Sequence, residues 1–543
     1  MADSEEPQVS PRVRWMLWTS FALLCYVQGV SELTLTVYLS TAAALFNGSV
    51  QYSTISVVES IISGASNLVY AKIADVFGRP LMLAGSLLFY ILGVIVLSSA
   101  HNIATLCVGI VLYAFGNTGI SFAIYLVTAD LVPARWRCTI SNVTLLPYVI
   151  NFGIASKITA RLVPLHWRWG IGMFAILVPV TAGPLAASLY FFSRQSNKTS
   201  TPPKRSLNKT VRALWQLDPL GLLLVTVGFG LLLLPLTIAD EAPHGYASGY
   251  IIAMFVIGAV SLLLFPVAEW FLAFPAINLR RLVALGSSVD LLVAIAIAVA
   301  DAMSVMISYT PAYNWVRVTF DWNVQDATYF LDAASLSVVI FGIVGGFVAT
   351  VTGRYKWLTV FGGGVRFLAL GLMYRYRGAG SSTFQIVFPQ VLQGLGGAVM
   401  TANLLVACQI AVPHADVAMV TGLFVMCEGV ADGIGSAIAG AIQGKLLGEL
   451  TRSLSAVGAS ETLIQAIYDD GVLALADYPL GSTIRTATIE AWERNTHQLL
   501  IAALVIAGVN FLLCFFLQDR KLPDKHNCIT DEKAGLPVLD DSI

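Results

Sequence analysis

Residues 111–116 read VLYAFG, and residues 391–396, which lie 280 positions further along the chain, read VLQGLG. A Val-Pro pair follows each hexapeptide at the same spacing, as Val132-Pro133 and as Val412-Pro413. Motifs that recur in the same order indicate that one part of a chain is a copy of another. The sequence therefore predicts two related halves.

The composition places these halves in a membrane. Of the 543 residues, 57% are hydrophobic and only 12% are charged, whereas a soluble globular domain carries about 25% charged residues. So few charged side chains cannot cover the surface of a soluble protein of this length. The net charge of −1 excludes a predominantly basic nucleic-acid-binding surface. The seven scattered cysteines contain no Cys-x-x-Cys pair, which argues against a zinc site or a disulfide framework.

Fourteen segments are apolar enough to cross a bilayer, which takes about 20 residues. In the first half, the expected spans are 15–46, 53–75, 81–100, 104–130, 138–163 and 169–193. Two further spans, at 217–239 and 249–272, separate the halves. In the second half, the expected spans are 282–311, 326–351, 356–377, 384–412, 416–446 and 497–518.

A third repeated motif follows the second span of each half. Asp75-Val76-Phe77-Gly78-Arg79 corresponds to Thr352-Gly353-Arg354, 275 positions later. Two six-helix halves related by an axis along the membrane normal are the architecture of major facilitator transporters. The predicted fold is therefore an all-α membrane protein of the major facilitator type, in which two inserted helices bring the total to fourteen.

Basic residues predict the orientation, because cytoplasmic loops carry an excess of Lys and Arg. With both termini in the cytoplasm, most of the 31 Lys and Arg residues fall on that side. The polar first eleven residues lack the pattern of a cleavable signal. The expected organisation is a cytoplasmic tail (1–14), a first half (15–193), a basic linker (194–216), two inserted helices (217–272), a second half (282–518) and a cytoplasmic tail (519–543). Within the second half, 447–496 is expected to be a long outer loop with helical patterning at 461–475.

The motif inventory predicts a gradient-driven transporter rather than an enzyme. The sequence contains no Gly-x-x-x-x-Gly-Lys-Ser/Thr loop for ATP phosphates, no His-Glu-x-x-His and no Gly-x-Ser-x-Gly. We therefore expect no bound cofactor. If protons drive transport, ionisable side chains inside the membrane must carry them.

Ionisable residues inside the expected spans are the candidates for proton coupling, because each costs about 2.5–3.5 kcal/mol on insertion scales. The candidates are Glu428, Asp432, Arg366, Asp301, Glu59 and Glu32. Glu428 and Asp432 are four residues apart and share a helix face. Glu428 and Arg366 both fall near the middle of the membrane, where we expect them to pair. For Glu32 and Asp301, simple pairing or snorkelling near the outer surface is an equal alternative.

The charged motif after the second span predicts a conformational latch. Asp75 and Arg79 flank Gly78 at the cytoplasmic end of that span. Their charges can bond neighbouring helix ends in one state of the transporter. Anchoring at the membrane interface is the alternative.

Six segments together resemble one family. They are 69–80 (VYAKIADVFGRP), 129–137 (ADLVPARWR), 167–176 (WRWGIGMFAI), 217–222 (LDPLGL), 234–237 (LPLT) and 412–418 (VPHADVA). The set resembles the fungal siderophore–iron transporters of the major facilitator superfamily. The similarity extends over nearly the whole chain, from about residue 15 to residue 518.

This resemblance implies fourteen helices, a large outer loop before the last helix and proton-driven import of ferric siderophores. Iron would arrive already wrapped in a hydroxamate-type chelator, so the chain would bind the chelate and would need no metal site of its own. The implied partners are this small molecule, protons and membrane lipids, with no nucleic acid, and the chain is expected to be a monomer. The plasma membrane is the expected location, with an endosomal or vacuolar membrane as the alternative.

Polar and aromatic residues on the inner helices are candidates for the cargo cavity. They are Tyr38, Tyr125, Tyr148, Asn151, Lys157, Tyr309, Tyr313, Gln390, Gln393 and Gln409, together with Glu59. Aromatic faces can pack against a chelate, and amides can bond its hydroxamate or peptide groups. Ordinary helix packing is the alternative for each.

Some positions depart from the family pattern and leave the cargo open. Glu59 replaces a usual Gln, Lys157 adds a charge, and 428–433 (EGVADG) is more acidic than usual. The alternatives are an exporter or exchanger of glutathione, a drug or a secondary metabolite, and a nutrient-sensing receptor. The 138–163 span lacks the Gly-Pro motif of proton-driven drug exporters, which favours import.

Overall fold

The computed structural model describes residues 11–45, 49–162, 166–196, 218–233, 235, 245–272, 275, 277–278, 280, 288–413, 416–469, 471–475 and 477–522. Most of the two predicted tails and of the basic linker lies outside these described residues. The predictions for those segments therefore remain predictions.

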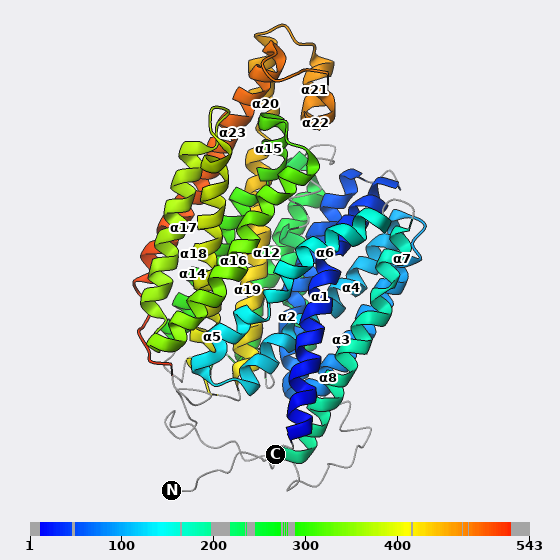
Figure 1. The fold of residues 1–543 in the computed structure, drawn as a ribbon, viewed down its shortest axis with the longest axis vertical. Coiled ribbons are helices and arrows are strands. Elements are labelled where there is room, and N and C mark those ends of the chain that lie inside the picture. Colours follow the sequence, from blue (N-terminus) through cyan, green and yellow to red (C-terminus); the bar gives the residue numbers. More distant parts are fainter. Residues whose placement is uncertain are drawn as a thin grey trace.

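Helices are the only extended regular elements in the described part of the chain (Figure 1). The first half contains α1 (Pro11–Leu45), α2 (Ser49–Phe77), α3 (Arg79–Ser98), α4 (Ile103–Leu131), α5 (Ala134–Val143), α6 (Leu146–Leu162), α7 (Trp167–Gly172) and α8 (Phe174–Ser196). The inserted segment contains α10 (Pro219–Leu233), the 3-10 turn η2 (Gly245–Ala247) and α12 (Gly249–Phe271). The second half contains α14 (Ser288–Tyr309), α15 (Ala312–Phe320), α16 (Val324–Thr352), α17 (Lys356–Tyr376), α18 (Thr383–Ile410), α19 (Val417–Gln443), α20 (Leu446–Ser455), α21 (Glu461–Asp469), α22 (Gly471–Ala474) and α23 (Thr483–Cys514).

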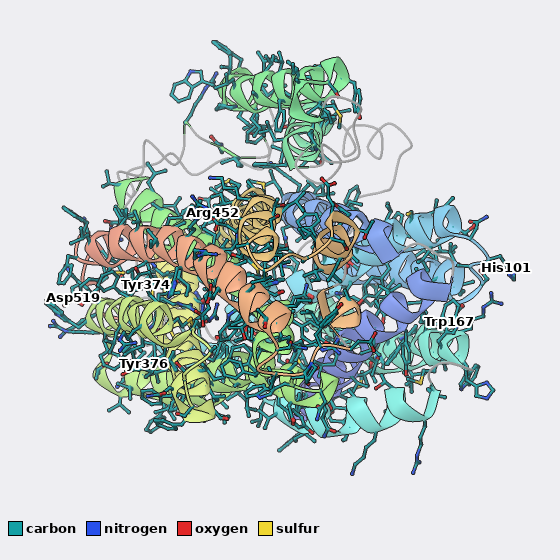
Figure 2. The ribbon with its side chains drawn as sticks, turned by 90° about the horizontal axis from the view of Figure 1, so that it is seen from above. His101, Trp167, Tyr374, Tyr376, Arg452 and Asp519 are labelled. Carbon is teal, nitrogen blue, oxygen red and sulfur yellow. The ribbon has the colours of Figure 1, made fainter. Side chains whose placement is uncertain are left out.

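Twelve helical segments of the described chain are long and apolar enough to cross a membrane. The helices α2 and α10 occupy the other two of the fourteen expected positions, although α2 is more polar and the apolar part of α10 is short. The all-α membrane fold is thus confirmed. Viewed from above, the green helices of the inserted pair stand at the edge of the bundle (Figure 2), where α10 packs against α2.

The helix pairings repeat between the halves, as the internal duplication predicts. In the first half α3 packs on α4, α2 on α4 and α1 on α8; in the second half α17 packs on α18, α16 on α18 and α14 on α23. The last glycine of each repeated hexapeptide makes these contacts close. A Cβ at Gly116 would overlap the backbone of Tyr90, and a Cβ at Gly396 would lie 2.8 Å from the Gly362 carbonyl oxygen. The motif therefore recurs because each half needs two helix backbones in contact.

The expected 138–163 span is divided into two helices. It begins at Ala134 and is interrupted between Val143 and Leu146. Pro147 lacks the backbone N–H that would otherwise bond to the Val143 carbonyl, and its ring disfavours a helical conformation in the preceding residue. This break redirects the outer part of the span, α6.

The segment expected as an outer loop, 447–496, is largely helical. The last helix begins at Thr483 rather than at residue 497, and α20, α21 and α22 precede it. The helices α21 and α22 confirm the helical pattern expected at 461–475. Together with α15 they form a cap at one end of the bundle (Figure 1), with an apolar core that includes Trp315, Leu450, Ile467 and Trp492.

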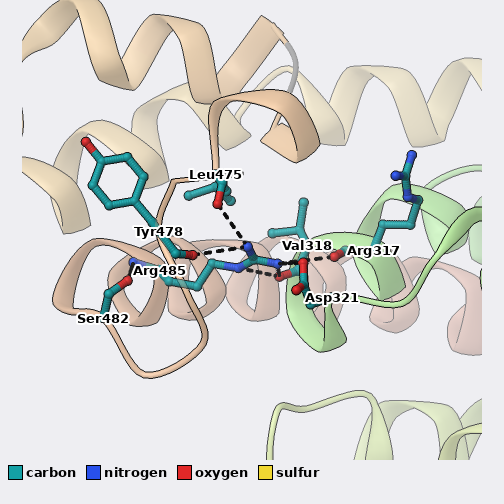
Figure 3. Close-up of polar contacts among 7 residues, drawn as sticks. All are labelled: Arg317, Val318, Asp321, Leu475, Tyr478, Ser482 and Arg485. Atoms are coloured by element: carbon teal, nitrogen blue, oxygen red, sulfur yellow. Dashed lines mark hydrogen bonds and ion pairs between the residues drawn. The ribbon is translucent and has the colours of Figure 1, made fainter.

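A buried arginine holds the cap together. Only 3% of Arg485 is exposed, and its guanidinium donates to the carbonyls of Val318, Leu475 and Tyr478 and to Asp321 Oδ1, at distances between 2.9 and 3.4 Å (Figure 3). Several acceptors around one charge offset its loss of hydration. The side chain thereby joins the start of α23 to the end of α15 and to the segment that follows α22.

Replacing this arginine should loosen the cap. We expect Arg485→Leu to lower the free energy of unfolding by about 3 kcal/mol, because buried carbonyls and Asp321 lose their donor. Limited proteolysis of the purified chain, followed by mapping of the cleavage sites, should show faster cutting within 456–482. Arg452→Leu, on the exposed side of α20, is the matched control. Equal cleavage of the two variants would contradict this role.

Candidate functional site

A central cavity of about 500 Å³ lies where the two halves meet. Helix α2 of the first half lines it, together with α14, α17, α18 and α19 of the second half. Its charged lining consists of Glu59, Asp301, Arg366, Glu428 and Asp432. The structure therefore brings five of the six proton-coupling candidates to one cavity inside the bundle.

Arg366 and Asp301 form a buried, two-point ion pair. Arg366 Nε lies 3.0 Å from Asp301 Oδ1, and Arg366 Nη2 lies 2.7 Å from Asp301 Oδ2. The exposed fractions of the two side chains are 6% and 8%, and the Asn510 amide donates a further hydrogen bond to Asp301 at 3.2 Å. The expected pair of Arg366 with Glu428 was therefore wrong. Asp301 lies well inside α14 rather than near the outer surface. Its two carboxylate oxygens accept two parallel hydrogen bonds from the planar guanidinium of Arg366.

The other three carboxylates of the cavity have no such partner. Among the described residues, none forms a hydrogen bond or ion pair with Glu59, Glu428 or Asp432, and all three line the cavity. Glu428 and Asp432 lie one turn apart on α19, and Glu59 lies opposite on α2. The cavity therefore holds four carboxylates against one guanidinium, which is already bound to Asp301.

Glu32 belongs to a different, smaller pocket of about 150 Å³ within the first half. Its carboxylate accepts hydrogen bonds from Asn117 Nδ2 at 3.1 Å and from Gln28 Nε2 at 3.3 Å. The Tyr148 hydroxyl donates to its second oxygen. Tyr125 lines the same pocket. Glu32 is thus held in a network, unlike the three carboxylates of the central cavity.

Three of the four predicted amide ligands of the cargo are hydrogen-bonded to neighbouring helices. Gln393 donates to the Ser308 hydroxyl at 2.8 Å, Gln409 to the Thr421 hydroxyl at 3.1 Å, and Asn151 to the Tyr26 carbonyl at 2.9 Å. All three residues are buried. Gln390 is also buried, with 1% of its surface exposed. The hydrogen bonds of Gln393, Gln409 and Asn151 fit helix packing, which was the alternative for each of these residues.

The remaining cavity candidates lie in separate places. Tyr38 is fully buried under Gly170, where a Cβ would lie 2.6 Å from its ring. Tyr313 lies in the cap, with the Arg317 guanidinium 5.7 Å from its ring centroid. Lys157 is exposed on α6, and Tyr309, at the end of α14, is 37% exposed. The structure does not bring these four to the central cavity.

The predicted latch residues join helix ends of the first half. Arg79 Nε lies 3.0 Å from Asp130 Oδ2 at the end of α4, and Gly78 has a φ of 86° between α2 and α3. Asp75 lies in the last turn of α2. At the same end of the bundle, α5 and α16 join the two halves: Arg135 Nε donates to the Thr350 carbonyl at 2.9 Å, and the Thr139 and Thr350 hydroxyls are 2.7 Å apart. The halves therefore contact each other at their predicted cytoplasmic ends.

Among the ionisable residues within expected spans that the sequence reasoning did not select, Asp332 and Glu269 lie in notable places. Asp332 lies on α16 and lines a second cavity between the halves. Glu269, 1% exposed on α12, accepts a hydrogen bond from the Ile277 backbone N–H at 2.8 Å. The signal that selected the other candidates, a charge within an apolar span, was present at both positions.

Solved structures with the same fold are transporters. The chain aligns with a bacterial homologue of the iron transporter ferroportin at a TM-score of 0.53 and 10% identity, covering 93% of this chain and all of that one. It aligns with the proton:xylose symporter XylE at a TM-score of 0.52 and 10% identity, covering 95% and 99%. This protein therefore has the major facilitator fold.

Curated proteins of similar sequence show to which family of the major facilitator fold this chain belongs. The chain is 30% identical over 515 residues to the MFS siderochrome iron transporter B of Aspergillus fumigatus, covering 92% of this chain and 82% of the relative. It is 28% identical over 507 residues to the low affinity heme transporter str3 of Schizosaccharomyces pombe, covering 91% and 80%. It is 26% identical over 543 residues to the siderophore iron transporter ARN2 of Saccharomyces cerevisiae, covering 95% and 86%. No family model matches the sequence. The chain belongs to the siderophore–iron transporters of the major facilitator superfamily.

Breaking the central ion pair from one side should cost more stability than removing it. We expect Asp301→Leu to lower the free energy of unfolding by about 3–5 kcal/mol, because Arg366 is left buried without a counter-charge. The double variant Asp301→Leu with Arg366→Met should recover most of this loss. Thermal unfolding of the detergent-purified protein measures both. A single variant as stable as the double variant would contradict the pairing.

Proposed function

We propose that this protein imports ferric siderophores by proton symport through alternating access. The central cavity supports the proposal most directly, because it is lined, at the contact between the two halves, by three carboxylates for which the described residues supply no hydrogen bond or ion pair. Its family membership supplies the cargo class: several of its relatives bear the name of siderophore transporters.

Protons would bind to Glu428, Asp432 and Glu59. An ionised carboxylate in an apolar, membrane-spanning region is costly, so each group gains by binding a proton or a cation before the cavity closes. Asp301 is less suited to this task because Arg366 and Asn510 already occupy its carboxylate oxygens. The ion pair would instead keep one guanidinium fixed beside the proton-binding groups.

The charge of the cavity favours some iron chelates over others. A ferric ion bound by three hydroxamates is neutral, because three single negative charges balance Fe³⁺. Heme carries two propionates, which four carboxylates and one already paired arginine would repel. We therefore propose a neutral ferric hydroxamate as the cargo rather than heme.

Entry would occur from the outer side. The contacts of α5 with α16 hold the halves together at their predicted cytoplasmic ends. Opening of these contacts, together with a change at the Arg79–Asp130 pair, would release the cargo inward. The first contacts join helix ends of the two halves, and the second joins helix ends within the first half.

Uptake of iron chelates tests the proposal. In yeast without its own siderophore transporters, we expect saturable uptake of radio-iron supplied as a ferric hydroxamate, abolished by a protonophore. Iron supplied as heme should enter more slowly, and fluorescence microscopy of the tagged protein should show it at the plasma membrane. No uptake of any chelate by protein at the cell surface would overturn the import proposal and favour an exporter or exchanger.

Neutralising the proposed proton site should abolish accumulation of the chelate but leave exchange of the chelate across the membrane intact. We expect Glu428→Gln to reduce protonophore-sensitive accumulation to background, because the side chain can no longer bind and release a proton. Exchange of labelled for unlabelled chelate across proteoliposomes should persist, since it needs no net proton movement. Glu461→Gln, on the exposed cap helix α21, is the control. Full accumulation by Glu428→Gln would exclude this residue as the coupling site.

A further inference from the structure

A second cavity, of about 480 Å³, lies on the seam between the halves. Helices α1 and α6 form one wall, and α16 forms the other. Most of the lining is apolar, including Leu33, Val149, Phe152, Leu336 and Val339. The Phe152 and Tyr329 rings, with centroids 5.5 Å apart, meet across the seam.

The surroundings of this cavity face the lipid. Beside the cavity lining, Ile150 on α6 and Ile340 on α16 are exposed. In a chain that spans a membrane, exposed apolar side chains at mid-helix face hydrocarbon rather than water. An apolar compound dissolved in the bilayer can therefore reach the seam without passing through the aqueous cavity.

One carboxylate interrupts the apolar lining. Asp332 lines the cavity, and no residue in the described part of the chain forms a hydrogen bond or ion pair with it. Two tyrosine hydroxyls of the lining have other partners: Tyr148 donates to Glu32, and Tyr329 accepts from Gln325 Nε2 at 2.8 Å. An ionised carboxylate in such a place is costly until a cation joins it.

We propose that this cavity binds lipophilic amines that enter from the bilayer. The apolar body of the ligand would fill the space between α6 and α16, and its single protonated amine would pair with Asp332. An apolar pocket with one charged group recognises this chemistry, since the walls take the body and the charge sets its orientation. A neutral compound of the same shape lacks the second contact.

Such a ligand would restrain transport. The cavity walls belong to different halves, which must move relative to each other during alternating access. A rigid body across the α6–α16 seam would hold the two walls at their present separation. Lipophilic amines would therefore inhibit the transporter without competing for the central cavity.

Equilibrium binding of tritiated 1-aminoadamantane to the purified full-length protein tests the proposal. We expect saturable binding that 1-adamantanol, a neutral compound of the same shape, displaces only weakly. Asp332→Asn should weaken the affinity by about tenfold or more, which corresponds to at least ~1.4 kcal/mol. Asp326→Asn, an exposed carboxylate in the first turn of the same helix, should leave it unchanged.

A second variant keeps the test decisive if Asp332→Asn is poorly folded. Leu336→Trp adds a ring to the cavity wall and should also abolish binding, while Glu428→Gln in the central cavity should not. Equal affinity in the Asp332→Asn protein, or equally strong displacement by 1-adamantanol, would overturn the proposal. Loss of binding in phospholipid nanodiscs, with binding retained in detergent, would show that a lipid occupies the cavity and would overturn it too.

Discussion

The ion pair between Arg366 and Asp301 determines the chemistry of the central cavity. A bilayer does not hydrate charges, so a guanidinium at this depth must find its partner within the protein. Arg366 on α17 takes Asp301 on α14, and Asn510 on α23 completes the arrangement. Three helices of the second half are joined in this way. Arg366, the guanidinium among the described residues that line the cavity, is therefore already paired, and it leaves Glu59, Glu428 and Asp432 without a counter-charge from this part of the chain.

The two halves share a backbone plan and differ in their polar groups. The same glycine-containing motif brings α3 to α4 and α17 to α18. The first half nevertheless surrounds Glu32 with Gln28, Asn117 and Tyr148, whereas the second half leaves the Glu428 and Asp432 carboxylates facing open space. Duplication therefore accounts for the fold. The difference between the two halves lies in these polar side chains, which the duplication did not preserve.

The sequence was sufficient to predict the fold, but it did not predict which side chains pair with each other within the site. Apolar length and repeated motifs predict the spans because the bilayer imposes one length on every helix. A charge within an apolar span must face the interior of the bundle, which is why five of the six ionisable candidates line the cavity. The rotation of each helix depends on packing, so the sequence could not show that Arg366 faces Asp301 or that Gln393 faces Ser308. The break before Pro147 was readable from local chemistry but was not predicted.

The last helix connects two regions that have been described separately. Helix α23 is a single element of 32 residues, about 48 Å long at 1.5 Å per residue. Arg485 near its start holds the cap, and Asn510 near its end bonds the central ion pair. The cap and the ion pair are therefore both bonded to this one helix. Arg485 in the cap and Asn510 beside Asp301 thus lie 25 residues apart on one continuous helix, about 38 Å at 1.5 Å per residue, so the helix itself sets the distance between the cap and the ion pair.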